Sequence, residues 1–234
     1  MRRKANFPFA LRSPCTIFGK SSKNIITKYM STTEKDILHE QVRNVKLRLR
    51  GVMNGITSTS MREKGLAYKV NFGVELPRLR EMAEELPHTY ALAAELWKED
   101  IRECRLLAAM LMPTEAFDED LAELWVEQMR FPEEAECTVM HLFDRLPFAS
   151  GKMFEWIAAD SSMHRLCGWL LASRLFMKGM MPNERDEQEL LDHLAADLRS
   201  TDRIVQRAAQ KALLRYMDLN EACETRGEKL LSTL

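Results

Sequence analysis

The spacing of apolar residues constrains the fold of this chain more than any other feature. From Thr33 onward, apolar side chains recur at intervals of three and four residues, and alternating strand-like runs stay short. Prolines stand at or beside the breaks between the periodic segments, where a proline can begin a helix but cannot continue one. These prolines are Pro77, Pro87, Pro113, Pro132, Pro147 and Pro182. The pattern predicts an all-α protein.

The segments between these breaks are short and numerous. Helices are predicted over residues 33–55, 77–86, 88–98, 99–112, 116–130, 132–146, 150–160, 162–178, 184–199 and 202–218. Antiparallel helices of this length and number do not fit one four-helix bundle, but they can stack as successive hairpins. We therefore expect an α-solenoid of HEAT-like or armadillo-like antiparallel helix pairs, forming a single domain over residues 31–234. The hairpin period follows from helix and turn spacing, because no exact sequence repeat is visible.

One segment departs from the helical pattern. Within residues 56–76, Tyr68, Val70, Phe72 and Val74 alternate in a short run. We favour a packed connection whose aromatic side chains cover the end of the solenoid, and a loop that contacts a ligand remains the alternative.

The beginning of the chain differs in composition from the rest. It carries seven cations before the first acidic residue, Glu34, and these are Arg2, Arg3, Lys4, Arg12, Lys20, Lys23 and Lys28. The apolar stretch around Pro8 is too short for a secretory signal. We expect residues 1–30 to form a disordered extension. A start codon assigned upstream of Met30 is the favoured origin, and an organellar transit peptide is the alternative.

Charge and cysteine content exclude several classes of protein. The 34 Lys and Arg against 35 Asp and Glu give a net charge of −1, so any nucleic-acid site must be local. The five cysteines include no C-x-x-C pair of the kind that binds zinc or acts in redox chemistry. Charged residues interrupt every apolar run before the roughly 18 residues that span a bilayer. We therefore expect a cytoplasmic protein with no membrane contact, no metal and no cofactor.

The tryptophans are expected in the core. Trp97, Trp125, Trp156 and Trp169 each stand among apolar residues at helical spacing. This setting is typical of core positions. An exposed platform for stacking bases is the alternative, because a sequence does not show exposure.

The sharpest local signal is a run of cations in the last predicted helix. Arg203, Arg207, Lys211 and Arg215 follow one another at intervals of four residues. On a helix such residues share one face about 6 Å apart, which is comparable to the spacing of phosphates along a nucleic-acid strand. The apolar residues off this face are predicted to form the buried side: Ile204, Val205, Ala208, Ala209, Ala212 and Leu213.

Two partners could balance the charge of these four cations. One is an external polyanion, because like charges four residues apart repel one another. The other is the preceding helix, which offers Glu184, Asp186, Glu187, Glu189, Asp192 and Asp197. The sequence leaves both open. A weaker basic set, Arg43, Lys46 and Arg50, is interpreted as a solvated helix face.

Two stretches resemble a known family. "YKVNFGVELPRLREMAEEL" and "ALAAELWKEDIRECRLLAAMLM" look like the N-terminal half of the AlkD-like DNA alkylation repair family, within the HEAT-like repeat DNA glycosylase superfamily. The likeness extends more loosely over residues 62–216. It implies a HEAT-like solenoid that holds duplex DNA in a concave basic groove, and some members of this family excise alkylated purines.

The resemblance also identifies where catalytic residues would stand. Active members use a carboxylate, aromatic residues and an arginine to stabilise the cationic sugar that forms as the glycosidic bond breaks. In an alignment without gaps, Met140 stands at the catalytic aspartate, Leu166 at the arginine and Lys211 at an aromatic residue. The nearby candidates are Asp144, one turn beyond Met140, and Arg165, beside Leu166. The resemblance therefore implies weak or no DNA-3-alkylpurine glycosylase activity.

Two functional hypotheses follow. The first is a monomeric DNA-binding protein that contacts duplex DNA, alkylated or not, through Arg203, Arg207, Lys211, Arg215 and Arg165. The second is a non-catalytic helical-repeat scaffold for an acidic protein partner.

Overall fold

The computed structural model describes residues 31–233, and the extension predicted for residues 1–30 lies outside them. Its helices are α2 (Thr32–Gly51), α3 (Gly55–Glu63), α4 (Leu76–Glu84), α5 (Tyr90–Lys98), α6 (Arg102–Leu111), η1 (Thr114–Ala116), α7 (Glu119–Gln128), α8 (Pro132–His141), η2 (Phe143–Arg145), α9 (Ala149–Ile157), α10 (Ser162–Met177), α11 (Glu184–Leu198), α12 (Arg203–Met217) and α13 (Glu221–Leu231). Within this part of the chain, β-structure is limited to one isolated bridge between Val70 and Ile101. The predicted all-α class is confirmed.

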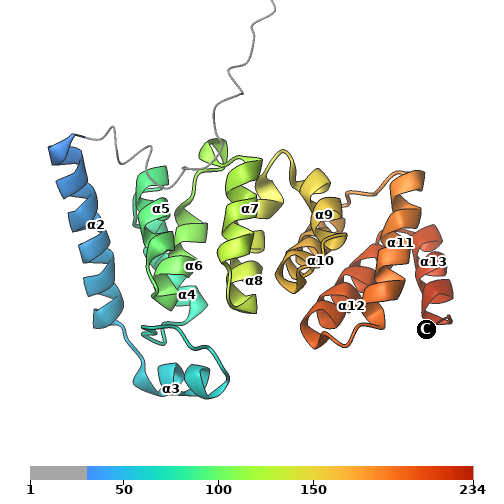
Figure 1. Cartoon of the computed structure of the whole chain (residues 1–234), viewed down its shortest axis with the longest axis horizontal. Coiled ribbons are helices and arrows are strands. Elements are labelled where there is room, and N and C mark those ends of the chain that lie inside the picture. The colour runs from blue at the N-terminus through green and yellow to red at the C-terminus, as the bar shows by residue number, and fades with distance from the viewer. Residues whose placement is uncertain (1–30, 234) are drawn as a thin grey trace, which may run out of the picture.

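The helices form two layers. Helices α4, α6, α8, α10 and α12 contact one another in that order and form one stack. Helices α5, α7, α9, α11 and α13 pack against this stack, and α2 packs against α5 and α6. Figure 1 shows the resulting row of helix pairs, from α2 in blue to α13 in red. The predicted solenoid of helix pairs is therefore present.

Local sequence signals set the helix ends. Asp202, the N-cap of α12, accepts hydrogen bonds from the backbone N–H groups of Ile204 and Val205, at 2.9 and 3.3 Å. Pro132 is the first residue of α8, where a missing N–H costs nothing. Helix α10 ends at Met177, and the turn after it contains Gly179, whose φ of +75° suits glycine. There, the N–H of Met180 reaches back to the carbonyl of Leu175 at 3.1 Å, as in a Schellman motif.

The core runs the length of the described molecule. All four tryptophans are buried, as predicted, and the rings of Trp97 and Trp125 stack with centroids 3.9 Å apart. Every residue of α10 from 166 to 173 is buried, because α8, α9 and α12 all pack against this helix. Helix α10 is therefore the centre of the C-terminal half.

The predicted helix boundaries were wrong at three places. Helix α3 occupies much of the segment that was predicted to be non-helical, and α13 follows the last predicted helix. The single helix predicted over 132–146 is two elements, α8 and η2. Leu142 between them adopts φ −132° and ψ −63°, outside the α-helical region, and this residue ends α8.

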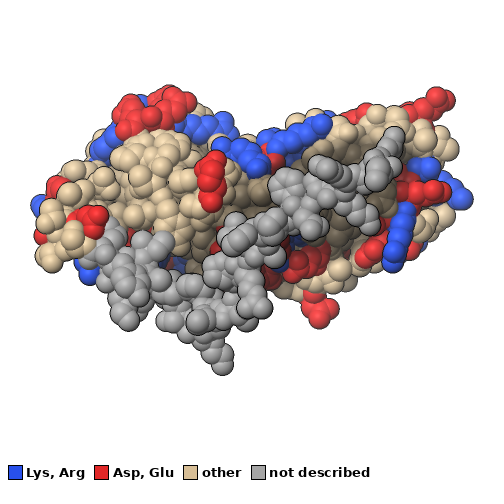
Figure 2. All heavy atoms as spheres, turned by 90° about the horizontal axis from the view of Figure 1, so that it is seen from above, with Lys and Arg blue, Asp and Glu red and all other residues tan. Residues whose placement is uncertain are grey.

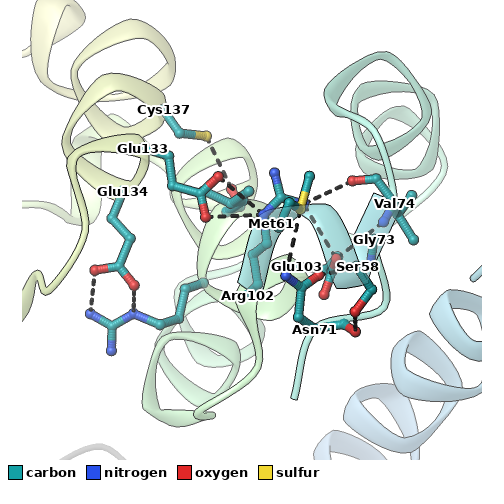
Figure 3. A network of polar contacts seen from close by, with 12 residues as sticks. Ser58, Met61, Asn71, Gly73, Val74, Arg102, Glu103, Glu133, Glu134 and Cys137 are labelled. Atoms are coloured by element: carbon teal, nitrogen blue, oxygen red, sulfur yellow. Dashed lines mark hydrogen bonds and ion pairs between the residues drawn. The ribbon is translucent and has the colours of Figure 1, made fainter. Parts of the chain in front are cut away.

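A buried polar network holds the rest of that segment, residues 64–75, against α6 and α8 (Figure 3). The carboxylate of Glu103 accepts the backbone N–H groups of Phe72 and Val74, at 3.1 and 3.2 Å. Arg102 donates to the carbonyl of Val74 at 2.8 Å and pairs with Glu133 at 3.0 Å. These bonds satisfy backbone groups of a loop that has no regular partner strand. The loop is thus a packed connection, as favoured.

Candidate nucleic-acid interface

The four cations predicted to share one face lie on the solvent side of α12. We call them the α12 stripe: Arg203, Arg207, Lys211 and Arg215, all of which are exposed. Most of the predicted buried side is buried, but Ile204 is 48% exposed, so its prediction was wrong. A helix turns 100° per residue, and this rotation places Ile204 at the edge of the buried arc rather than inside it.

The acidic residues of α11 have other partners. Glu187 accepts a hydrogen bond from the hydroxyl of Tyr216 at 2.6 Å and pairs with Arg226. Among the described residues, no carboxylate of α11 lies within ion-pair distance of the α12 stripe. Arg215 alone within the stripe has a carboxylate partner in this part of the chain, Asp218, at 3.0 Å one turn further along α12. The structure therefore does not support neutralisation of the stripe by α11.

Arg165 is held by an ion pair. Its guanidinium donates to Asp197 at 2.7 Å, and the indole N–H of Trp169 donates to the same carboxylate at 2.6 Å. The pair joins the first turn of α10 to the end of α11. Arg165 also lowers the pKa of nearby Asp202, although hydrogen bonding from Ser162 is the largest cause of that shift. Arg165 therefore lies beside the N-terminal end of α12 with part of its side chain exposed.

The three positions aligned with the family's catalytic residues have different environments. Leu166 is buried in the core and cannot contact a ligand. Met140 is partly exposed near the end of α8, where Nη2 of Arg80 lies 3.7 Å from its sulfur. Lys211 is exposed on α12. An apolar side chain thus stands at two of the three positions, and neither can stabilise a cationic sugar.

Asp144, the nearby acidic candidate, is committed to ion pairs. Its side chain is 2% exposed and pairs with Arg174 at 2.7 Å and with Lys178 at 3.3 Å. Arg174 stands nine residues beyond Arg165 on α10, about 13 Å along the helix axis. The two nearby candidates, Asp144 and Arg165, therefore have separate partners at opposite ends of α10.

A second basic group surrounds His141. We call it the His141 cluster, and it consists of His141, Asp144, Arg80, Arg145, Arg174 and Lys178. Burial lowers the pKa of His141, and the positive charges of Arg80, Arg145 and Arg174 lower it further, while Asp144 acts in the opposite direction. The Nε2 atom of His141 is buried without a hydrogen-bond partner in the structure. Four cations thus face one carboxylate at the C-terminal ends of α8 and α10, where the helix dipoles favour positive charge.

The sequence contained no signal for the His141 cluster. Its members come from α4, α8, η2, α10 and the turn after α10, so only the stacking of these helices brings them together. Seen from above, Figure 2 shows a gathering of basic side chains near the middle of the molecule.

The α12 stripe and the His141 cluster are neighbours. Arg215, the last member of the stripe, lines an open depression together with Phe176, Met177 and Asp218. Lys178, which belongs to the His141 cluster, follows Met177 directly. The two basic groups therefore meet where α10 and α12 end, and such an arrangement attracts anions.

Residues 31–233 contain no group of three or more His, Cys, Asp or Glu side chains that could hold a metal ion. None of the helices in this range is both long and apolar enough to cross a bilayer.

Comparisons with known proteins agree with this fold. A solved structure, described as a new family of proteins related to the HEAT-like repeat DNA glycosylases with affinity for branched DNA structures, has a TM-score of 0.71 to this chain. The match covers 81% of each chain at 14% sequence identity, and it shows that the fold is HEAT-like. No curated protein matches the sequence. The family described as DNA alkylation repair enzyme matches residues 45–225, most of the 234 residues, and the chain therefore belongs to this family.

Proposed function

We propose that the protein binds duplex DNA, including branched DNA, through the concave basic surface of the stack α4, α6, α8, α10 and α12. The α12 stripe supplies the main phosphate contacts, and the His141 cluster extends the surface. Arg165 adds a minor contact beside the first turn of α12. The observation that carries the proposal is that Arg203, Arg207 and Lys211 have no carboxylate of residues 31–233 within ion-pair distance, although an acidic helix packs against α12.

We also propose that the protein has weak or no alkylpurine glycosylase activity. Met140 cannot supply the negative charge that the reaction needs, and Asp144 is buried between Arg174 and Lys178. Because these two cations offset its negative charge, the Asp144 carboxylate can do little to stabilise the sugar cation that develops in the reaction. Binding without efficient base excision is therefore the function that this surface supports best.

The proposal is tested by removing two cations of the α12 stripe together. Arg207→Ala with Lys211→Ala should weaken binding of a fluorescent linear duplex and lower the slope of log affinity against log salt by about one unit per lost contact. The melting temperature should stay nearly constant, because exposed charges contribute little to stability.

A matched control removes the same charge elsewhere. Arg62 and Lys64 are exposed at the end of α3, at the opposite end of the molecule from α12 in Figure 1. Arg62→Ala with Lys64→Ala should leave the salt slope as it is. If wild-type protein fails to bind DNA even at low salt, the proposal is wrong, and the scaffold for an acidic protein partner is favoured. Normal DNA binding by the stripe variant, with a much lower melting temperature, would instead show that Arg207 and Lys211 are structural.

A further inference from the structure

Three methionines are exposed together just after the basic surface. Met177, Met180 and Met181 are 56%, 45% and 54% exposed, and they surround the turn that ends α10. The hydrogen bond from Met180 to Leu175 and the positive φ of Gly179 fix the backbone of this turn. The apolar side chains are therefore presented by a defined turn rather than by a loose end. We call these three residues the methionine patch.

The methionine patch borders the α12 stripe directly. Met177 lines the open depression that also contains Arg215, and the sulfur of Met181 lies 3.3 Å from the side-chain nitrogen of Asn220, which caps α13. Lys178 stands within the same turn. A ligand whose phosphates contact the stripe would thus meet apolar surface at the C-terminal ends of α10 and α12.

The continuity of the patch with the α12 stripe favours DNA over a protein as its partner. Arg215 and Lys178, which flank the methionines, are paired with Asp218 and Asp144. Met177 shares the depression with Arg215, and one helical turn before Arg215 stands Lys211, which has no carboxylate partner in the described part of the chain. In an uninterrupted duplex the base faces are stacked inside and offer no apolar partner. At a branch point some base pairs have one open face, beside phosphates, and an apolar side chain can pack there. Methionine suits this task, because its side chain is flexible and polarizable.

We propose that the methionine patch packs against the open base faces of a DNA branch point while the α12 stripe holds the adjoining phosphates. This inference rests on the proposed function and adds the structural element that distinguishes a branch from a linear duplex. The methionine patch sets the preference for branched over linear DNA, and the α12 stripe contributes to the affinity for both.

The test replaces the three methionines by glutamines of nearly equal length. Met177→Gln, Met180→Gln and Met181→Gln together should leave the affinity for a linear duplex unchanged. Affinity for a three-way junction with the same arm sequence should fall about tenfold, towards the linear value, since less apolar surface is buried. A 2-aminopurine placed at the branch point should change its fluorescence with wild-type protein and not with the triple variant.

The control changes exposed apolar side chains at the other end of the molecule. Met53 lies just before α3 and Ile56 within it, and they are 58% and 85% exposed. Met53→Gln with Ile56→Gln should keep the junction preference. If wild-type protein binds linear duplex but shows no preference for the junction, or if the triple variant keeps that preference, the inference is wrong while the proposed function stands. In the second case the patch belongs to a protein contact instead. If wild-type protein binds no DNA at all, the proposed function itself fails.

Discussion

At the scale of single residues, His141 shows how neighbouring groups from several elements set the chemistry of one side chain. Burial and three arginines lower its pKa, and the carboxylate of Asp144 only partly opposes them. The folded protein therefore favours the neutral imidazole, whereas the unfolded chain binds a proton at an ordinary pKa of about 6.5.

This difference predicts how stability depends on pH. Because the unfolded state binds more protons as the pH falls through the ordinary histidine range, acid should lower the free energy of unfolding. We expect His141→Gln to lose less stability than wild type between pH 7.5 and 5.5. Urea unfolding at several pH values measures this. Parallel pH profiles for the two proteins would contradict it, since all other titrating groups are shared.

Asp144 gives a second prediction at this scale. Asp144→Asn leaves Arg174 and Lys178 without their carboxylate, and we expect a loss of about 1–3 kcal/mol in the free energy of unfolding, because these partners are only partly buried. Thermal or urea unfolding reports the loss. Unchanged stability would mean that the carboxylate is free for another role.

At the scale of elements, the loop over 64–75 depends on one glycine. Gly73 has φ +72°, and a Cβ at this position would lie 2.6 Å from the backbone nitrogen of Ser58 and closer still to the carbonyl oxygen of Asn54. Both the backbone conformation and the space around it therefore require glycine. The loop crosses the start of α3 at this point.

Gly73→Ala should consequently destabilise the protein by at least about 2 kcal/mol, through backbone strain and the clash with α3. Gly151→Ala is the matched control, since Gly151 lies in α9 with nothing within 4 Å of the added Cβ. That control should be neutral or stabilising by about 0.5–1 kcal/mol, because alanine favours a helix. Chemical denaturation compares the two, and equal effects would show that Gly73 is not required.

Elements with their own amphipathic period were predictable, and those that depend on tertiary contacts were not. The spacing of cations and apolar residues predicted helix α12 together with its basic stripe. Helix α3 contains Ile, Thr and Ser, which are weak helix formers, and it is supported by Asn54 and by the bond from Ser58 to Asn71. Gly227 of α13 faces Met217, so close packing rather than a long apolar stripe holds that helix. The His141 cluster required the positions of several helices at once.

At the scale of the whole molecule, family membership and basic surface lead to separate expectations about binding and chemistry. Binding needs only the exposed cations, whereas base excision needs a negative charge at the sugar. The molecule has the exposed cations, but the side chains at the aligned catalytic positions supply no negative charge.

We therefore expect no efficient release of alkylated purines. A duplex treated with a methylating agent, incubated with the protein and then cleaved at abasic sites, should give strand breaks at the level of the sample without protein. Release well above that level would contradict the proposal. If Asp144→Asn then abolished this release at a temperature where the variant is folded, Asp144 would be identified as the catalytic carboxylate.

The positions of the tryptophans determine which parts of the solenoid can be monitored by intrinsic fluorescence. Trp97, Trp125 and Trp156 stand in α5, α7 and α9, whereas α11, α12 and α13 contain no indole. Trp169 in α10 alone reaches this last unit, because its N–H donates to Asp197 of α11. Separation of α11 would remove that acceptor and alter the emission of a single fluorophore. Intrinsic fluorescence therefore reports, through Trp169, on the end of the protein that we propose to bind DNA, and a Trp169→Phe variant would give no signal from that end.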